Sequence, residues 1–79
     1  MTAARREPRA PRRGTVTEFD EARGLGEISD RDGVRFPFHC TAIADSSRQI
    51  AIGASVVFRL APGHRGRYEA RDIETLGPG

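Results

Sequence analysis

The side chains most able to do chemistry in this sequence are two histidines, His39 and His64, and one cysteine, Cys40. Nucleophilic catalysis needs a nucleophile within reach of a base, and the histidines and carboxylates here show no such spacing. One cysteine and two distant histidines also lack the spacing of a metal site. The glycines of 24–26 lie between expected strands, so they do not form a dinucleotide-binding loop. We therefore predict that this chain is not an enzyme and takes no metal and no cofactor.

The lone cysteine, Cys40, cannot form a disulfide within the chain. A redox-sensing thiol would need neighbouring groups that activate the thiolate, and nothing near Cys40 in the sequence does so. We expect Cys40 to be a small, half-buried apolar residue at the end of a strand.

Positive charge is unevenly distributed along the chain, and all 13 basic residues are arginines. Residues 1–13 hold five arginines against one glutamate, a net charge of +4, whereas residues 14–79 hold eight arginines against ten acidic residues, a net charge of −2. The basicity therefore belongs to the N-terminal tail, and the rest is slightly acidic. A slightly acidic domain is unusual for one that holds a phosphate backbone.

A chain of 79 residues is long enough for one small domain. Residues 1–13, rich in arginine and with two prolines, are expected to form a flexible arm, residues 14–76 the domain, and residues 77–79 a frayed end. No apolar run approaches the roughly 18 residues of a membrane span, and no secretory signal begins the sequence. We expect a cytoplasmic monomer with no membrane contact.

Short β-rich segments separated by turn residues follow one another from residue 14. The expected strands are 14–19, 24–29, 34–39, 54–60 and 68–76. Asp32-Gly33 indicates a tight hairpin turn, residues 41–43 a single helical turn, and 62–66 a further turn. Five short strands with a longer loop after the third predict an all-β fold, a small five-stranded antiparallel OB-fold barrel. The strand pattern alone leaves an SH3-like barrel open.

Five motifs within these segments occur in a recognisable order. They are GTVTEFD at 14–20, RGLGEI at 23–28, FPFHCTAI at 36–43, GASVVF at 53–58 and GHRG at 63–66. Their order and spacing resemble the bacterial cold-shock domain, with its G-x-V-K-W-F-N, K-G-F-G-F-I, V-F-V-H-F-S-A-I, G-x-x-V-x-F and G-x-R-G segments. The resemblance covers about four-fifths of the chain. It implies that six apolar residues take core positions: Val16, Ile28, Ile43, Val56, Phe58 and Ile73.

The departures from this family fall on its binding face, where solvent-facing aromatic residues stack on bases. Here the tryptophan position is Glu18, and the four phenylalanine positions are Leu25, Glu27, Pro37 and Cys40. Stacking on an aromatic residue is worth about 1–3 kcal/mol per base. The loss of five aromatic residues should cost at least roughly 5 kcal/mol, or more than a thousandfold in affinity.

The resemblance implies a remaining nucleic-acid-binding set. These residues are Phe19, Arg23, Leu25, His39 and Arg65. Phe19 either stacks on a base or packs partly against the barrel. His39 either contacts a base or is a surface histidine without that role.

Two functions are compatible with the sequence. The first is weak, salt-sensitive binding of single-stranded RNA or DNA, in which the arginine arm either contacts phosphates or only solubilises the chain. The second is a protein-interaction module that presents Glu18, Glu27 and Leu25 to a basic protein partner.

Overall fold

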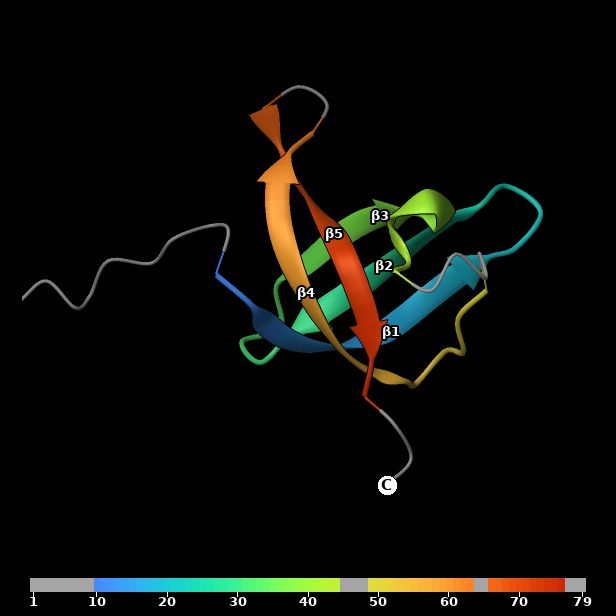
Figure 1. Cartoon of the computed structure of the whole chain (residues 1–79), viewed down its shortest axis with the longest axis horizontal. Coiled ribbons are helices and arrows are strands. Elements are labelled where there is room, and N and C mark those ends of the chain that lie inside the picture. The colour runs from blue at the N-terminus through green and yellow to red at the C-terminus, as the bar shows by residue number, and fades with distance from the viewer. Residues whose placement is uncertain (1–9, 45–48, 64–65, 77–79) are drawn as a thin grey trace, which may run out of the picture.

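The computed structural model describes residues 10–44, 49–63 and 66–76, which form five strands and a short 3-10 helix (Figure 1). These elements are β1 (Arg12–Asp20), β2 (Leu25–Asp30), β3 (Arg35–His39), the helix η1 (Cys40–Ala42), β4 (Ser55–Pro62) and β5 (Tyr68–Thr75). The strand order is β3-β2-β1-β4-β5, and each strand is antiparallel to its neighbours. The predicted all-β class with five antiparallel strands is confirmed. No helix in the described ranges is long and apolar enough to cross a membrane.

Strand β1 pairs with strands on both of its sides. Its first residues pair with β4 and its later residues with β2. Arg12 and Arg13, which the sequence analysis placed in the arm, are strand residues because they pair with Phe58 and Val57 of β4. The strand therefore begins two residues before the predicted domain boundary. The rest of the predicted arm, and the predicted end at 77–79, lie outside the described residues.

A β-bulge at Thr17 bends β1 in its middle. Val16 pairs with Ile28 and Glu18 pairs with Glu27, which leaves Thr17 as the additional residue. The Thr17 hydroxyl donates to the carbonyl oxygen of Glu27 at 3.3 Å. As a result Val16 is buried in the core, while Glu18 is exposed two residues later.

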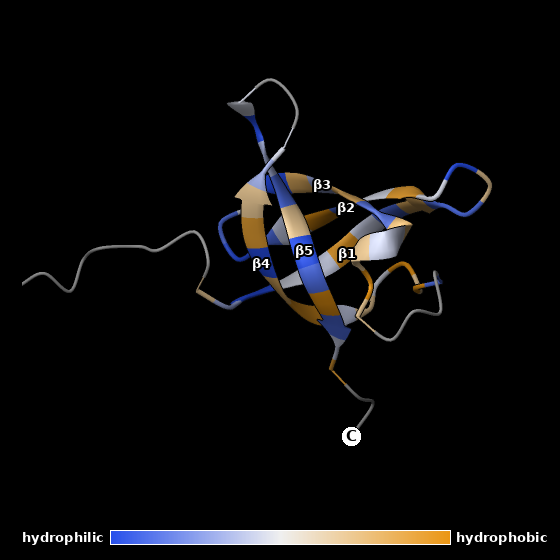
Figure 2. Cartoon of the chain, turned by 45° about the horizontal axis from the view of Figure 1, so that its top comes forward, coloured by the Kyte–Doolittle hydropathy of each residue, from blue (hydrophilic) through white to orange (hydrophobic). Residues whose placement is uncertain are grey.

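The core lies between the curved strands, as the apolar segments of Figure 2 indicate. Val56, Phe58 and Leu60 alternate along β4 and are buried, as the sequence pattern predicts. No polar or charged residue in the described ranges is buried. The buried apolar residues include all six that the family resemblance placed in the core: Val16, Ile28, Phe38, Ile43, Val56, Phe58, Leu60, Ala70 and Ile73.

The two outer strands of the sheet, β3 and β5, contact each other. The link between them is a parallel bridge from Ile43, just after η1, to Ile73 of β5, and the Ala44 N–H donates to the Ile73 carbonyl at 2.8 Å. The described residues show no hydrogen-bonded ladder between β3 and β5, so packing and this bridge bring the edges together. Pro37, which has no N–H to donate, lies on the outer strand β3, where proline is tolerated.

Candidate nucleic-acid interface

The outward side chains of β1, β2 and β3 form one surface, which we call the three-strand face. Inward side chains between them, such as Ile28 and Phe38, are buried in the core. The register aligns the outward residues in three rows across the strands. The rows are Asp20, Leu25 and His39; Glu18, Glu27 and Pro37; and Thr15, Ser29 and Arg35.

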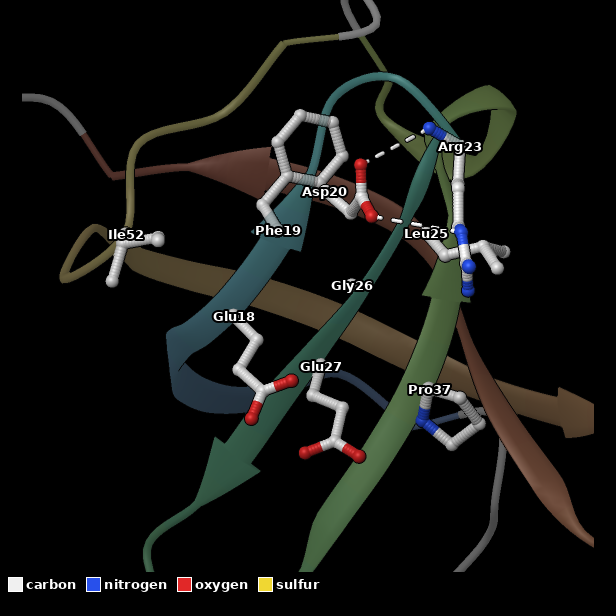
Figure 3. A pocket seen from close by; sticks show the side chains of 9 residues that line it. All are labelled: Glu18, Phe19, Asp20, Arg23, Leu25, Gly26, Glu27, Pro37 and Ile52. Atoms are coloured by element: carbon white, nitrogen blue, oxygen red, sulfur yellow. Dashed lines mark hydrogen bonds and ion pairs between the residues drawn. The ribbon is translucent and has the colours of Figure 1, made fainter.

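An open depression occupies the centre of this face (Figure 3). Leu25 and Ile52 supply exposed apolar surface, with 47% and 64% of their area accessible. Three carboxylates and one guanidinium group also line the depression, so it is acidic. Its lining is Glu18, Phe19, Asp20, Arg23, Leu25, Gly26, Glu27, Pro37 and Ile52.

The structure brings four of the five predicted binding residues together. Phe19, Arg23 and Leu25 line the depression, and His39 is the cross-strand neighbour of Leu25. Arg65 lies outside the described residues.

Phe19 packs against the barrel and also borders the depression. Its ring stacks on the buried Phe38 ring, with a centroid distance of 5.9 Å and an interplanar angle of 4°. Gly26 makes room for this pair, since a Cβ there would lie 2.5 Å from Phe38 Cζ and 2.6 Å from the Glu18 carbonyl oxygen. One side of the Phe19 ring is therefore occupied by the core, which limits this residue to at most one exposed stacking side.

Arg23 is held loosely at the turn between β1 and β2. Its Nε lies 3.8 Å from Asp20 Oδ2, and its backbone N–H donates to Asp20 Oδ1 at 3.2 Å. The Arg23 side chain is 77% exposed, and exposed ion pairs contribute only about 0–1 kcal/mol. A phosphate can therefore replace Asp20 as the partner of this guanidinium at little cost.

His39 presents one ring nitrogen to solvent. Its Nδ1 accepts the backbone N–H of Thr41 at 3.2 Å, so the neutral ring carries its proton on Nε2. Nε2 makes no hydrogen bond with any described residue and is available as a donor to a base or a phosphate. The neighbouring Cys40 is half-buried and packs against the core, as predicted.

Glu18 and Glu27 lie directly opposite each other on β1 and β2. Arg35 offsets part of this charge, with Nη1 at 3.7 Å from Glu27 Oε1. That separation suits an ion pair but is too long for a hydrogen bond, and Glu27 Oε1 is buried without a hydrogen-bond partner. The two carboxylates repel each other, which destabilises the strand pair, and they would also repel an approaching phosphate.

Three further residues of this surface, Asp20, Arg35 and Ile52, were not predicted from the sequence. Asp20 and Arg35 could have been found from the two-residue period of their strands, because they are in phase with Glu18 and Pro37. Ile52 belongs to the loop before β4, and no local pattern places it beside β1. Across the described ranges, no group of histidine, cysteine or acidic side chains is arranged to hold a metal ion.

No protein-family model and no curated protein sequence matches this chain. Solved structures do match it, among them a chain described as Drosophila Unr CSD456, a set of cold-shock domains. The TM-score is 0.73 and the sequence identity 29%, over 90% of this chain. The chain has the cold-shock domain fold. Because its structure matches cold-shock domains, the SH3-like alternative is excluded. The chain spans 29% of the length of the Drosophila chain.

The cold-shock fold indicates which class of ligand to consider for the three-strand face. This fold is generally associated with nucleic-acid binding and with binding domains that are not catalytic. In this chain the fold keeps its apolar core, while the face carries the carboxylates of Glu18 and Glu27 where the resemblance places aromatic residues.

Proposed function

We propose that this chain binds single-stranded RNA or DNA weakly, through a cold-shock face in which few aromatic contacts remain. The observation that carries this proposal is the gathering of Phe19, Arg23, Leu25 and His39 on one side of a cold-shock fold. Leu25 and one side of Phe19 offer apolar contact to a base, and Arg23 and His39 offer donors to phosphate or base edges. Binding is non-catalytic and uses no cofactor.

The expected affinity is low and depends strongly on salt. Without stacking aromatic residues, most of the binding free energy comes from phosphate contacts, and such binding has a Kd of about 10⁻⁴–10⁻⁶ M at physiological salt. Fluorescence anisotropy with labelled single-stranded DNA and RNA, at two or more salt concentrations, tests this proposal. Measurable binding at low salt that weakens steeply as salt rises supports it, and no binding at low salt contradicts it.

The acidic depression supports a second candidate function, binding of a basic protein segment. Leu25 and Ile52 supply exposed apolar surface, and Glu18, Asp20 and Glu27 belong to the same lining. Charges of this sign attract arginine and lysine side chains and repel phosphates. Titration with an arginine- and lysine-rich peptide distinguishes the two functions, because a protein-interaction module should bind the peptide and not the oligonucleotide.

A further inference from the structure

The arginines of the described ranges divide into paired and unpaired groups. Four guanidinium groups lie 3.6–3.8 Å from a carboxylate oxygen: those of Arg12, Arg23, Arg35 and Arg71. The side chains of Arg13, Arg31 and Arg67 make no hydrogen bond, ion pair or ring contact with any described residue. The positive charge most available to an anion is therefore outside the acidic depression.

Two of the unpaired arginines line one groove. Arg13 at the start of β1 and Arg31 in the turn after β2 flank it, and its floor carries the hydroxyl residues Thr15, Ser29 and Ser55. The register places Ser55, Thr15 and Ser29 directly across β4, β1 and β2. We call this site the hydroxyl groove.

The polar groups of the hydroxyl groove are suited to an anion. The hydroxyls of Thr15 and Ser55 make no hydrogen bond with any described residue, while the Ser29 hydroxyl is 3.3 Å from the Asp30 carbonyl oxygen. All three can donate to an oxyanion. Two guanidinium groups beside three hydroxyls are a typical set of phosphate contacts.

The one carboxylate at the hydroxyl groove is already satisfied. The Asp30 side chain is only 9% exposed, and its Oδ2 lies 3.7 Å from Arg12 Nη1. Its Oδ1 accepts the backbone N–H groups of Asp32 at 2.8 Å and Val34 at 2.9 Å. Because these partners offset the charge of Asp30, the net field in the groove comes from Arg13 and Arg31.

We propose that the hydroxyl groove binds a backbone phosphate of the single strand, an inference that rests on the proposed nucleic-acid function. The groove continues the three-strand face, because Thr15 and Ser29 form its third row. Leu25 and Ser29 are four residues apart on β2, or about 13 Å at the rise of a strand. One strand can therefore contact Leu25 and His39 with its bases and the groove with a phosphate.

The test is the salt dependence of oligonucleotide binding by variants of the full chain. R13Q and R31Q should each lower the slope of log K against log salt, and the double variant, which loses the contacts to one phosphate, should lower it by about 0.7. R67Q is the matched control, since Arg67 is also exposed and unpaired but lies beside the β4–β5 turn, and it should leave the slope unchanged. Circular dichroism should show each variant folded.

The possible outcomes distinguish failure of the phosphate site in the hydroxyl groove from failure of the proposed nucleic-acid binding. An equal effect of R13Q, R31Q and R67Q would mean diffuse electrostatic attraction and would overturn the groove, as would unchanged slopes for R13Q and R31Q. If the wild-type chain binds no oligonucleotide, the proposed function fails, and NMR titration with inorganic phosphate decides the groove. Shifts centred on Thr15, Ser29 and Ser55 then retain it as a phosphate site, and their absence overturns it.

Discussion

Glu18 illustrates how one residue can change a binding surface without changing the fold. It occupies the place of the family's tryptophan, it is exposed, and it lies opposite Glu27. Like charges that face each other across a strand pair are destabilising, so packing does not explain this pair. The physical consequence is a face that repels phosphate at its centre, which is why the structure favours a phosphate site at its margin.

Replacing Glu18 with glutamine should improve both stability and oligonucleotide binding. E18Q removes the repulsion from Glu27, which should raise the free energy of unfolding by about 0.2–1 kcal/mol. One charge fewer near a phosphate should tighten binding roughly two- to fivefold at low salt. Urea unfolding and fluorescence anisotropy measure the two effects.

The matched control for E18Q is E74Q. Glu74 is also exposed, but it lies on β5 opposite Val57, away from the three-strand face. E74Q changes the net charge equally and should leave the affinity nearly unchanged. Equal gains in affinity for both variants would show that only net charge matters and would contradict the account of the face.

Asp30 holds the β2–β3 turn and the start of β1 together. Its carboxylate accepts two backbone N–H groups in the turn and pairs with Arg12, whose guanidinium lies 5.9 Å from the centre of the Phe36 ring. D30A should lower the free energy of unfolding by about 1.5–3 kcal/mol, the range for hydrogen bonds to a charged group.

D30N separates the two roles of Asp30. The asparagine oxygen can still accept the turn N–H groups, so D30N should lose clearly less stability than D30A. Urea unfolding should show lower midpoints at an unchanged m-value. Equal losses for both variants would assign the stabilisation to the charge instead of the turn.

At the scale of elements, the packing of β2 against β3 determines what the face can present. Gly26 on β2 lies against the Phe38 ring of β3, which in turn stacks on Phe19. This contact fixes Phe19 as a half-buried ring. The position of the main remaining aromatic residue of the face therefore depends on a glycine that binds nothing itself.

G26A should disturb this packing. The added methyl group would approach Phe38 and the Glu18 carbonyl far more closely than van der Waals contact allows, and overpacking of this kind costs about 1–3 kcal/mol. Thermal unfolding should show a lower Tm, and NMR shifts of the Phe19 ring should change. A variant with wild-type stability and unchanged ring shifts would contradict this packing.

The strands were predicted well where the local sequence pattern is strong. They were predicted less well where pairing with a neighbouring strand determines the bounds or the register. The alternation of Val56, Phe58 and Leu60 identified β4 and its buried side. The composition around Arg12 and Arg13 is that of a flexible arm, yet pairing with β4 makes these residues the start of β1. The bulge at Thr17 depends on the register with β2, which no single segment encodes.

The sequence indicated residues that lie near one another in the structure, but it did not indicate which of their charges are neutralised. The family resemblance identified Phe19, Arg23, Leu25 and His39, and the structure places them on one face. Which arginines are neutralised depends on contacts in space, such as that of Arg35 with Glu27. The sequence therefore could not show that the side chains of Arg13 and Arg31 are unpaired among the described residues.

Across the whole molecule, the basic tail and the slightly acidic domain should act together on a polyanion. Deletion of residues 1–9, which leaves the β1 strand residues Arg12 and Arg13 in place, should weaken oligonucleotide binding without lowering stability. Three arginines are lost, so the slope of log K against log salt should fall by up to about 2. Glutamine at Arg5, Arg6 and Arg9 in the full chain is the length-matched control. An unchanged slope would make the tail a solubilising segment only.

The most direct test of a retained nucleic-acid face is an NMR titration of the labelled full chain with single-stranded DNA and RNA. The shifts should centre on Phe19, Arg23, Leu25 and His39 and persist at moderate salt, of about 0.15 M. Shifts confined to residues 1–9, or no shifts at all, would contradict a retained face and would turn attention to a basic protein partner.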